Sequence, residues 1–271
     1  MMRPRTIHHV AVHVFKESVR DKVLYSIVLF AVLLMGASFL IGQLSAGQDV
    51  KIIKDLGLAA ISVFGLFIAI FIGIGLVSKE VEKRSIYALL AKPLSRSELI
   101  AGKFAGLALT LGINVAVMAA VYFALLAYYG WTTPDAVRRA WEAPAADPRL
   151  LTAILLIYLQ LLIVNAIALF FSTFTSPLMA AAFSLGLWVA GHFNADLRTL
   201  DQVVDAAAAS AIGTTLYYLL PNLAAFDVKS LVVHGQHVPA GLVGLNAAYA
   251  AMYIGVLLIA AALIFSRRDF K

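Results

Sequence analysis

The sequence contains no cysteine, and charged residues make up only 13% of its 271 positions. The absence of cysteine excludes a disulfide framework, a thiolate nucleophile and a thiolate metal site. The scarcity of charge excludes an ordinary soluble domain, in which about a quarter of the residues are charged. The short alternating segments of a membrane β-barrel are missing from the sequence as well. What the chain has instead is apolar residues, 62% of the total, and a mean hydropathy of +0.91.

The apolar residues fall into runs of about 20, the length that crosses the hydrocarbon core as a helix. We therefore predict an all-α polytopic membrane protein with a single transmembrane domain over residues 1–271. Its six transmembrane helices are expected at residues 23–44, 56–77, 104–129, 150–171, 177–193 and 242–265. The long, partly apolar connection at 194–241 is expected outside the membrane, with short helices at the outer interface.

An amphipathic helix is predicted over residues 5–22, ahead of the first span. Its apolar residues recur at the spacing of one helical face: Ile7, Val10, Ala11, Val14, Phe15 and Val19. Histidines and charged residues occupy the rest of the helical surface. Such a helix is expected to lie along the cytoplasmic membrane interface. The alternative is that it packs on a neighbouring cytoplasmic element.

Lys and Arg residues are distributed unevenly between the two sides of this six-span arrangement. The side that carries both termini and the loop 78–103 would hold 14 of the 21. Because cytoplasmic segments of membrane proteins are enriched in Lys and Arg, both termini and this loop are predicted to be cytoplasmic. The same rule explains the net charge of +6 without a nucleic-acid partner.

The loop 78–103 holds charge that the rest of the chain lacks. Its charged residues are Lys79, Glu80, Glu82, Lys83, Arg84, Lys92, Arg96, Glu98 and Lys103. A water-soluble partner is expected to dock there; the alternative is an ordinary solvated loop. Local signals predict a helix capped by Ser78 and running to Leu90, then a stop at Pro93. Ser95 and Glu98 form a capping-box pattern, which predicts the start of the next helix.

Small residues indicate close helix contacts in two places. The second span contains Gly65, Ala69, Gly73 and Gly75, and the third begins with Gly102 and Gly106. Glycine and alanine allow two membrane helices to approach closely, so both sets are expected at helix interfaces. Residues 45–55, between the first two spans, are instead expected to form a polar loop.

No motif in the sequence supports catalysis. Asp, Glu, Lys and Arg are missing from the middle of every predicted span, so a secondary carrier would lack its usual ion or proton relay. Three amide residues do lie within spans, as interhelical hydrogen-bonding partners or as part of a pathway: Asn114, Gln160 and Asn165. The histidine pairs at 9 and 13 and at 234 and 237 lack an evident third ligand, so no metal site is predicted.

The central loop also resembles a known family. Residues 80–90 read EVEKRSIYALL, and Pro93-Leu94-Ser95-Arg96 and Gly102-Lys103 follow. This pattern is similar to that of permeases of ABC-2-type transporters. The amphipathic helix, six spans, long fifth connection and short basic tail match too, so the resemblance covers the whole chain. The sequence departs from the pattern at Ser85, where glycine is usual, and at Ala91-Lys92.

The resemblance implies a permease subunit, expected to be an exporter, in the bacterial inner membrane. It implies a homodimer, or a pair with a paralogous permease, that binds cytoplasmic ABC ATPase subunits. This chain would bind no cofactor, since ATP and Mg²⁺ belong to the ATPase. The residues expected to couple the two subunits are Lys79, Glu80, Glu82, Lys83, Arg84, Ile86, Leu89, Leu90, Pro93 and Arg96. The alternative function is a self-contained secondary carrier or a membrane scaffold protein.

Overall fold

The computed structural model describes residues 4–43, 49–82, 95–193, 217 and 220–267, and every regular element in these ranges is helical. The helices are α1 (Pro4–Val19), α2 (Lys22–Gln43), α3 (Asp49–Glu82), α5 (Arg96–Thr132), α6 (Asp135–Arg138), α7 (Leu150–Ser172), α8 (Pro177–His192), α11 (Lys229–Val233) and α12 (Ala240–Arg267), with one 3-10 turn, η2 (Ala224–Phe226). The all-α class predicted from the sequence is confirmed for the described residues.

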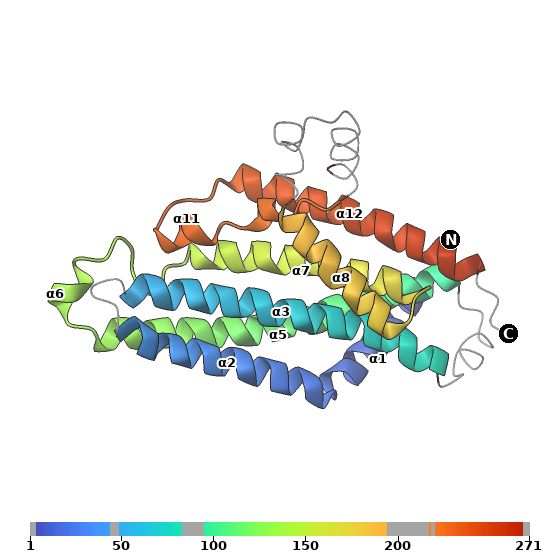
Figure 1. Cartoon of the computed structure of the whole chain (residues 1–271), viewed down its shortest axis with the longest axis horizontal. Helices are drawn as coiled ribbons and strands as arrows, with labels where there is room; N and C mark the ends of the chain where they lie inside the picture. Colours follow the sequence, from blue (N-terminus) through green and yellow to red (C-terminus); the bar gives the residue numbers. More distant parts are fainter. Residues whose placement is uncertain (1–3, 44–48, 83–94, 194–216, 218–219, 268–271) are drawn as a thin grey trace, which may run out of the picture.

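The long helices run side by side along the longest axis of the molecule (Figure 1). One end of the bundle carries α1, the start of α5 and the end of α12, and we call it the α1 end. The opposite end carries α6, and we call it the α6 end. In this view α2 and α12 form the two sides of the bundle, with α3, α5 and α7 between them.

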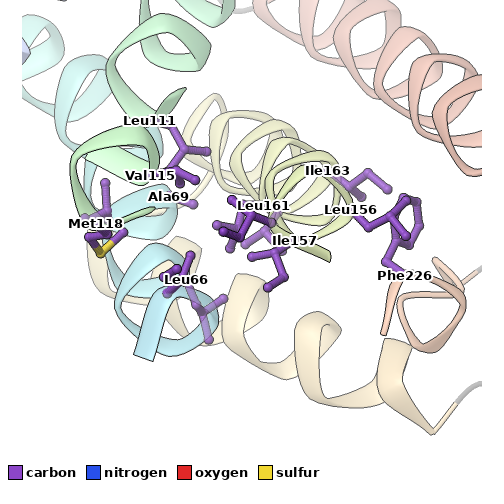
Figure 2. Close-up of a cluster of buried hydrophobic side chains, with 14 of the residues drawn as sticks. Leu66, Ala69, Leu111, Val115, Met118, Leu156, Ile157, Leu161, Ile163 and Phe226 are labelled. Carbon is purple, nitrogen blue, oxygen red and sulfur yellow. The ribbon is translucent and has the colours of Figure 1, made fainter. Parts of the chain in front are cut away.

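Helix α7 is the centre of the hydrophobic core. It contacts α3, α5, α8 and α12, and it is buried on more than one side. Leu161 points towards α3, whereas Leu156 and Ile163 lie on the other side of α7, near Phe226 of η2 (Figure 2). Each of these four side chains is at most 1% exposed. A helix that is apolar all round is expected in such a fully enclosed position.

Helix α3 approaches its neighbours closely at three glycines. A Cβ atom at Gly57 would overlap the ring of Tyr122 on α5, and one at Gly65 would overlap Leu161 on α7. At Gly73 the added atom would lie 2.7 Å from a side chain of α7. The contacts predicted at Gly65 and Gly73 are therefore confirmed, and Gly57 adds a third that the sequence did not single out. The close contact predicted at Gly75 is wrong for the described residues, because a Cβ atom there would have nothing within 4 Å.

Helix α1 crosses the start of α5 at a second pair of glycines. A Cβ atom at Gly102 would lie 2.7 Å from Cβ of Val10. One at Gly106 would lie 2.6 Å from the backbone oxygen of Ala11. The helix contact predicted at Gly102 and Gly106 is confirmed, and the apolar face of α1 packs on a neighbouring helix. A position of α1 along the membrane interface stays a prediction.

Polar contacts join two connections at the α6 end. The carboxylate of Glu142 accepts a hydrogen bond from Nζ of Lys51 at 2.7 Å, and its other oxygen lies 3.1 Å from Nδ1 of His234. The hydrogen bond from Lys51, followed by that from His234, lowers the pKa of the Glu142 carboxyl. Arg149 also donates a hydrogen bond to the backbone oxygen of Gly235. The segment before α7 is thereby held against the segment between α11 and α12.

Five of the described helices, α2, α3, α5, α7 and α12, are long and apolar enough to cross a membrane. Helix α8 is apolar but has 16 residues. At 1.5 Å per residue it measures about 24 Å, less than the roughly 30 Å of a hydrocarbon core. A sixth crossing at residues 177–193 therefore stays a prediction. Short helices do occur in the described part of the 194–241 connection, as expected.

Two expectations about helix ends are wrong. Helix α3 has 34 residues and begins at Asp49, so residues 49–55 are helical and not a polar loop. Ser78 lies inside α3 and does not cap a new helix. The apolar run marks the part of α3 suited to the membrane. The helix extends beyond this run, and polar residues outside it can form hydrogen bonds. Tyr129, for example, donates a hydrogen bond to Asp49 at 3.1 Å.

We expect Gly106→Ala to weaken the α1–α5 crossing. The added methyl group meets the backbone of Ala11, which cannot rotate away, and overpacking of this kind costs about 1–3 kcal/mol. Thermal unfolding of the purified chain in detergent should show a lower Tm. The control is Gly36→Ala on α2, where a Cβ atom has nothing within 4 Å. Equal Tm values for the two variants would contradict the crossing.

Candidate coupling site

Four of the ten predicted coupling residues lie in helices at the α1 end of the bundle. Lys79, Glu80 and Glu82 belong to the last turns of α3, and Arg96 is the first residue of α5. The structure describes the backbone of these four residues. The other six lie outside the described residues: Lys83, Arg84, Ile86, Leu89, Leu90 and Pro93. The predicted helix to Leu90 and the stop at Pro93 fall in the same undescribed segment.

Both helices that flank the loop belong to the packed centre of the bundle. Helix α3 contacts α5 and α7, and α5 in turn contacts α7 and α1. Figure 1 shows the end of α3 and the start of α5 at the same end of the molecule. A displacement of the loop would therefore act on two helices of the core, and not on one peripheral element.

The start of α5 is fixed by reciprocal hydrogen bonds. Ser95 is in an extended conformation, with φ −71° and ψ 141°, and its Oγ accepts from the backbone N–H of Glu98 at 3.3 Å. The side chain of Glu98 accepts from the backbone N–H of Ser95, also at 3.3 Å. The predicted capping box is confirmed. Two of the N–H groups that a helix start leaves unpaired are satisfied, so α5 begins at a defined residue.

Two charges assigned to the exposed loop are buried. Glu98 is 4% exposed and Lys103 is 2% exposed, and each interacts with other parts of the chain. Charged side chains are almost never buried unless they are paired. The reason for their burial is tertiary, because α1 covers this part of α5 at Gly102 and Gly106. Glu98 and Lys103 therefore belong to the packed start of α5, and they are not part of the proposed docking surface.

The three intramembrane amides have different surroundings. Asn114 donates a hydrogen bond to the backbone oxygen of Thr110 on its own helix, at 2.8 Å. Gln160 Nε2 lies 2.9 Å from Nε2 of His192, so this pair joins α7 to α8. Whether either residue lines a pathway stays a prediction.

Asn165 is the third amide and is fully buried. Neither of its amide atoms has a hydrogen-bond partner among the described residues. Its oxygen lies 3.0 Å from the position that a Cβ atom of Gly73 would occupy, so it faces the α3–α7 contact. A buried unpaired amide is destabilising, and such groups in native proteins call for a specific explanation.

The histidines have no arrangement typical of a metal centre in the described ranges. No group of three His, Cys, Asp or Glu side chains in that part of the chain is placed to hold a metal ion. His234 interacts with Glu142, and His237 is exposed. His9 and His13 are both exposed on α1.

Comparison with models of protein families gives one match, to the ABC-2 family transporter protein, over residues 9–270. The match extends from α1 past the end of α12. The chain belongs to the ABC-2 transporter family. A comparison with curated proteins finds no match. An ABC-2 protein of this kind is the multi-pass membrane permease component of an ABC transporter, generally not catalytic itself, and it works with an ABC ATPase subunit.

Two features of this ABC-2 permease could not be read from its sequence. One is the burial of Glu98 and Lys103, which look like members of a continuous charged loop. The other is the position of Asn165 opposite Gly73. Gly73 was expected at a helix interface, but its partner depends on the rotation of α7 about its axis. A helix as apolar as α7, with few and scattered polar residues, has no continuous polar face that would reveal this rotation.

Ser95→Ala should loosen the first turn of α5, because the backbone N–H of Glu98 loses its acceptor. Loss of an N-cap costs about 1 kcal/mol. Hydrogen exchange should accelerate at the amides of residues 97–99, and it should return towards the wild-type rate in Ser95→Asp, which retains a capping oxygen. Identical exchange in the two variants would count against a role for the cap.

Asn165→Leu should leave the Tm of the isolated chain unchanged or raise it. The substitution removes an amide whose unpaired burial costs about 1–3 kcal/mol. Gln160→Leu is the comparison variant, and it should lower the Tm because His192 loses a neighbour. A clear fall in Tm for Asn165→Leu would show that the amide has a partner in the folded protein.

Proposed function

We propose that the chain is the permease subunit on which a separate cytoplasmic ABC ATPase docks through residues 78–103. The observation that carries this proposal is the concentration of charge between two helices of the core, α3 and α5. Membership of the ABC-2 family indicates that this partner is an ABC ATPase. The docking contacts are assigned to the charged residues from Lys79 to Arg84 and to the apolar residues Ile86, Leu89 and Leu90.

In this proposal, ATP-driven movement of the ATPase displaces the loop and tilts the helices attached to it. Helix α5 carries α1 with it, because the two are closely packed at Gly102 and Gly106. Helix α3 acts on α7 through the contacts at Gly65 and Gly73. The movement thus reaches the buried amide of Asn165, which faces this contact.

The assembly is proposed to be a homodimer, or a pair with a paralogous permease. A stripe of large apolar side chains on α12 supports it: Leu245, Met252, Val256, Ile259 and Leu263, each at least 59% exposed in the single chain. Their spacing places them on one helical face. In a membrane this face is covered by lipid or by a second permease, and ABC-2 subunits that act in pairs need such a surface.

The proposed topology has both termini in the cytoplasm, with the α1 end of the bundle inside the cell and the α6 end outside. The bias of Lys and Arg towards the α1 end supports this orientation. It requires an even number of crossings, so we assign the sixth to α8. A bacterial inner membrane is the expected location.

For the work performed, we propose export of a substrate or transmission of conformational change across the membrane. The size and loop pattern of the chain are similar to those of the permease of the nitrous-oxide-reductase maturation transporter. The competing function, a self-contained carrier or a scaffold, needs no ATPase. Native mass spectrometry of the tagged chain, expressed with its genomic neighbours, separates the two. Two copies with two ATPase chains support the transporter, and a chain without an ATPase supports the alternative.

Reversing two charges, with Glu80→Lys and Arg84→Glu together, should abolish co-purification of the ATPase. Both changes lie in the proposed docking segment and outside the apolar runs of the sequence, so membrane insertion should be preserved. The control is Lys229→Glu at the α6 end, which should retain the ATPase. Unchanged co-purification in the double variant would contradict the docking assignment.

A further inference from the structure

A cavity of about 180 Å³ opens at the α6 end of the bundle. It lies between the first turns of α3, the segment after α6, and α11. Its polar lining comes from Lys51, Lys54 and Glu142, and its apolar lining includes Val50, Trp141 and Val233. A single water molecule needs only about 10–15 Å³ of such space. The cavity is therefore large enough for a small ligand.

Lys54 is the unusual residue of this cavity. It is 1% exposed, and it borders the cavity. Its ammonium group has no hydrogen bond or ion pair with any residue that the structure describes, whereas its backbone oxygen accepts a hydrogen bond from Tyr122 at 3.0 Å. A cation at the end of a buried side chain, without an ion pair, is destabilising, so a charge of opposite sign is favoured beside it.

Glu142, one of the two neighbouring carboxylates, is already engaged on both of its oxygens. Glu142 binds Lys51 at 2.7 Å and His234 at 3.1 Å. Asp147 accepts from the backbone N–H of Arg149 at 2.9 Å. Its other oxygen is buried, has no hydrogen bond among the described residues and lies 3.8 Å from the Arg149 guanidinium. Both carboxylates act on Lys54 through space, but neither forms an ion pair with it. The cavity beside Lys54 therefore has room for an anion from outside the chain.

We propose that this cavity binds a phosphate group, with Lys54 at its base and Lys51 beside it. The two lysines are three residues apart and so lie on the same face of α3. They are in its first two turns, where the helix dipole adds positive potential. Lysine binds phosphate as a point charge, without the planar geometry that arginine requires. The group is either free inorganic phosphate or the headgroup phosphate of a lipid. This site does not depend on ATPase docking.

The test compares wild-type chain with Lys54→Met, both purified in an uncharged detergent. Inorganic phosphate is titrated at constant ionic strength, with chloride as the exchanged anion, and the Tm is recorded. If the site binds free phosphate, the Tm of the wild type should rise to a plateau as phosphate is added. The Tm of Lys54→Met should not rise. Without phosphate, Lys54→Met should be at least as stable as the wild type, because an unpaired charge is removed. Lys229→Met, on α11, is the matched control and should keep the wild-type response.

A second experiment tests whether the phosphate group belongs to a lipid. Native mass spectrometry measures retention of phosphatidylglycerol against diacylglycerol, which lacks the phosphate. Preferential retention that is lost in Lys54→Met assigns the site to a lipid headgroup. If Lys54→Met does not fold, Lys51→Met replaces it, since Lys51 is partly exposed, and it should weaken either signal several-fold. The proposal is overturned if neither phosphate nor phosphatidylglycerol gives a signal that depends on these lysines, as expected if water alone fills the cavity.

Discussion

The close packing of α3 against α5 and α7 is the constraint on which the rest of this permease depends. Lipid is as apolar as the helix surfaces, so helices in a membrane are held together by tight van der Waals contact. Glycines on α3 provide that contact by leaving room for Tyr122 of α5 and for Leu161 of α7. With α3 in place, α7 is enclosed on its other sides by α8 and α12, and the core is complete.

The same kind of contact joins the core to the surface at which an ATPase is proposed to act. Gly102 and Gly106 allow α1 to lie against α5 at the point where the charged loop ends. The capping box of Ser95 and Glu98 fixes the first turn of α5 at that point. The loop is thus attached to α5, which begins at a defined residue and packs closely against α1. This arrangement suits the transmission of a displacement of the loop to the helices.

Charge has two different roles in this chain. At the α1 end, the charged residues from Lys79 to Arg84 are the proposed docking site of the ATPase, whereas Glu98 and Lys103 at the start of α5 are buried. At the α6 end, Lys51, Glu142 and His234 hold the connections together, while Lys54 borders a cavity without an ion-pair partner in the described structure. Between the ends the buried polar groups are amides and hydroxyls, and the Asn165 amide lies at the α3–α7 contact.

The sequence alone determined the all-α membrane class and the family resemblance. The bounds of α2, α7, α8 and α12 fall within two residues of the apolar runs, and the capping box and the glycine contacts other than that at Gly75 were predicted too. These features depend on local pattern, because apolar length, capping residues and small residues act within one helix. Tertiary structure decided the length of α3, the burial of Glu98 and Lys103, and the lack of a side-chain partner for Asn165 and Lys54 among the described residues. Those outcomes depend on which face of one helix meets another, and a uniformly apolar helix carries no sequence pattern that specifies its rotation.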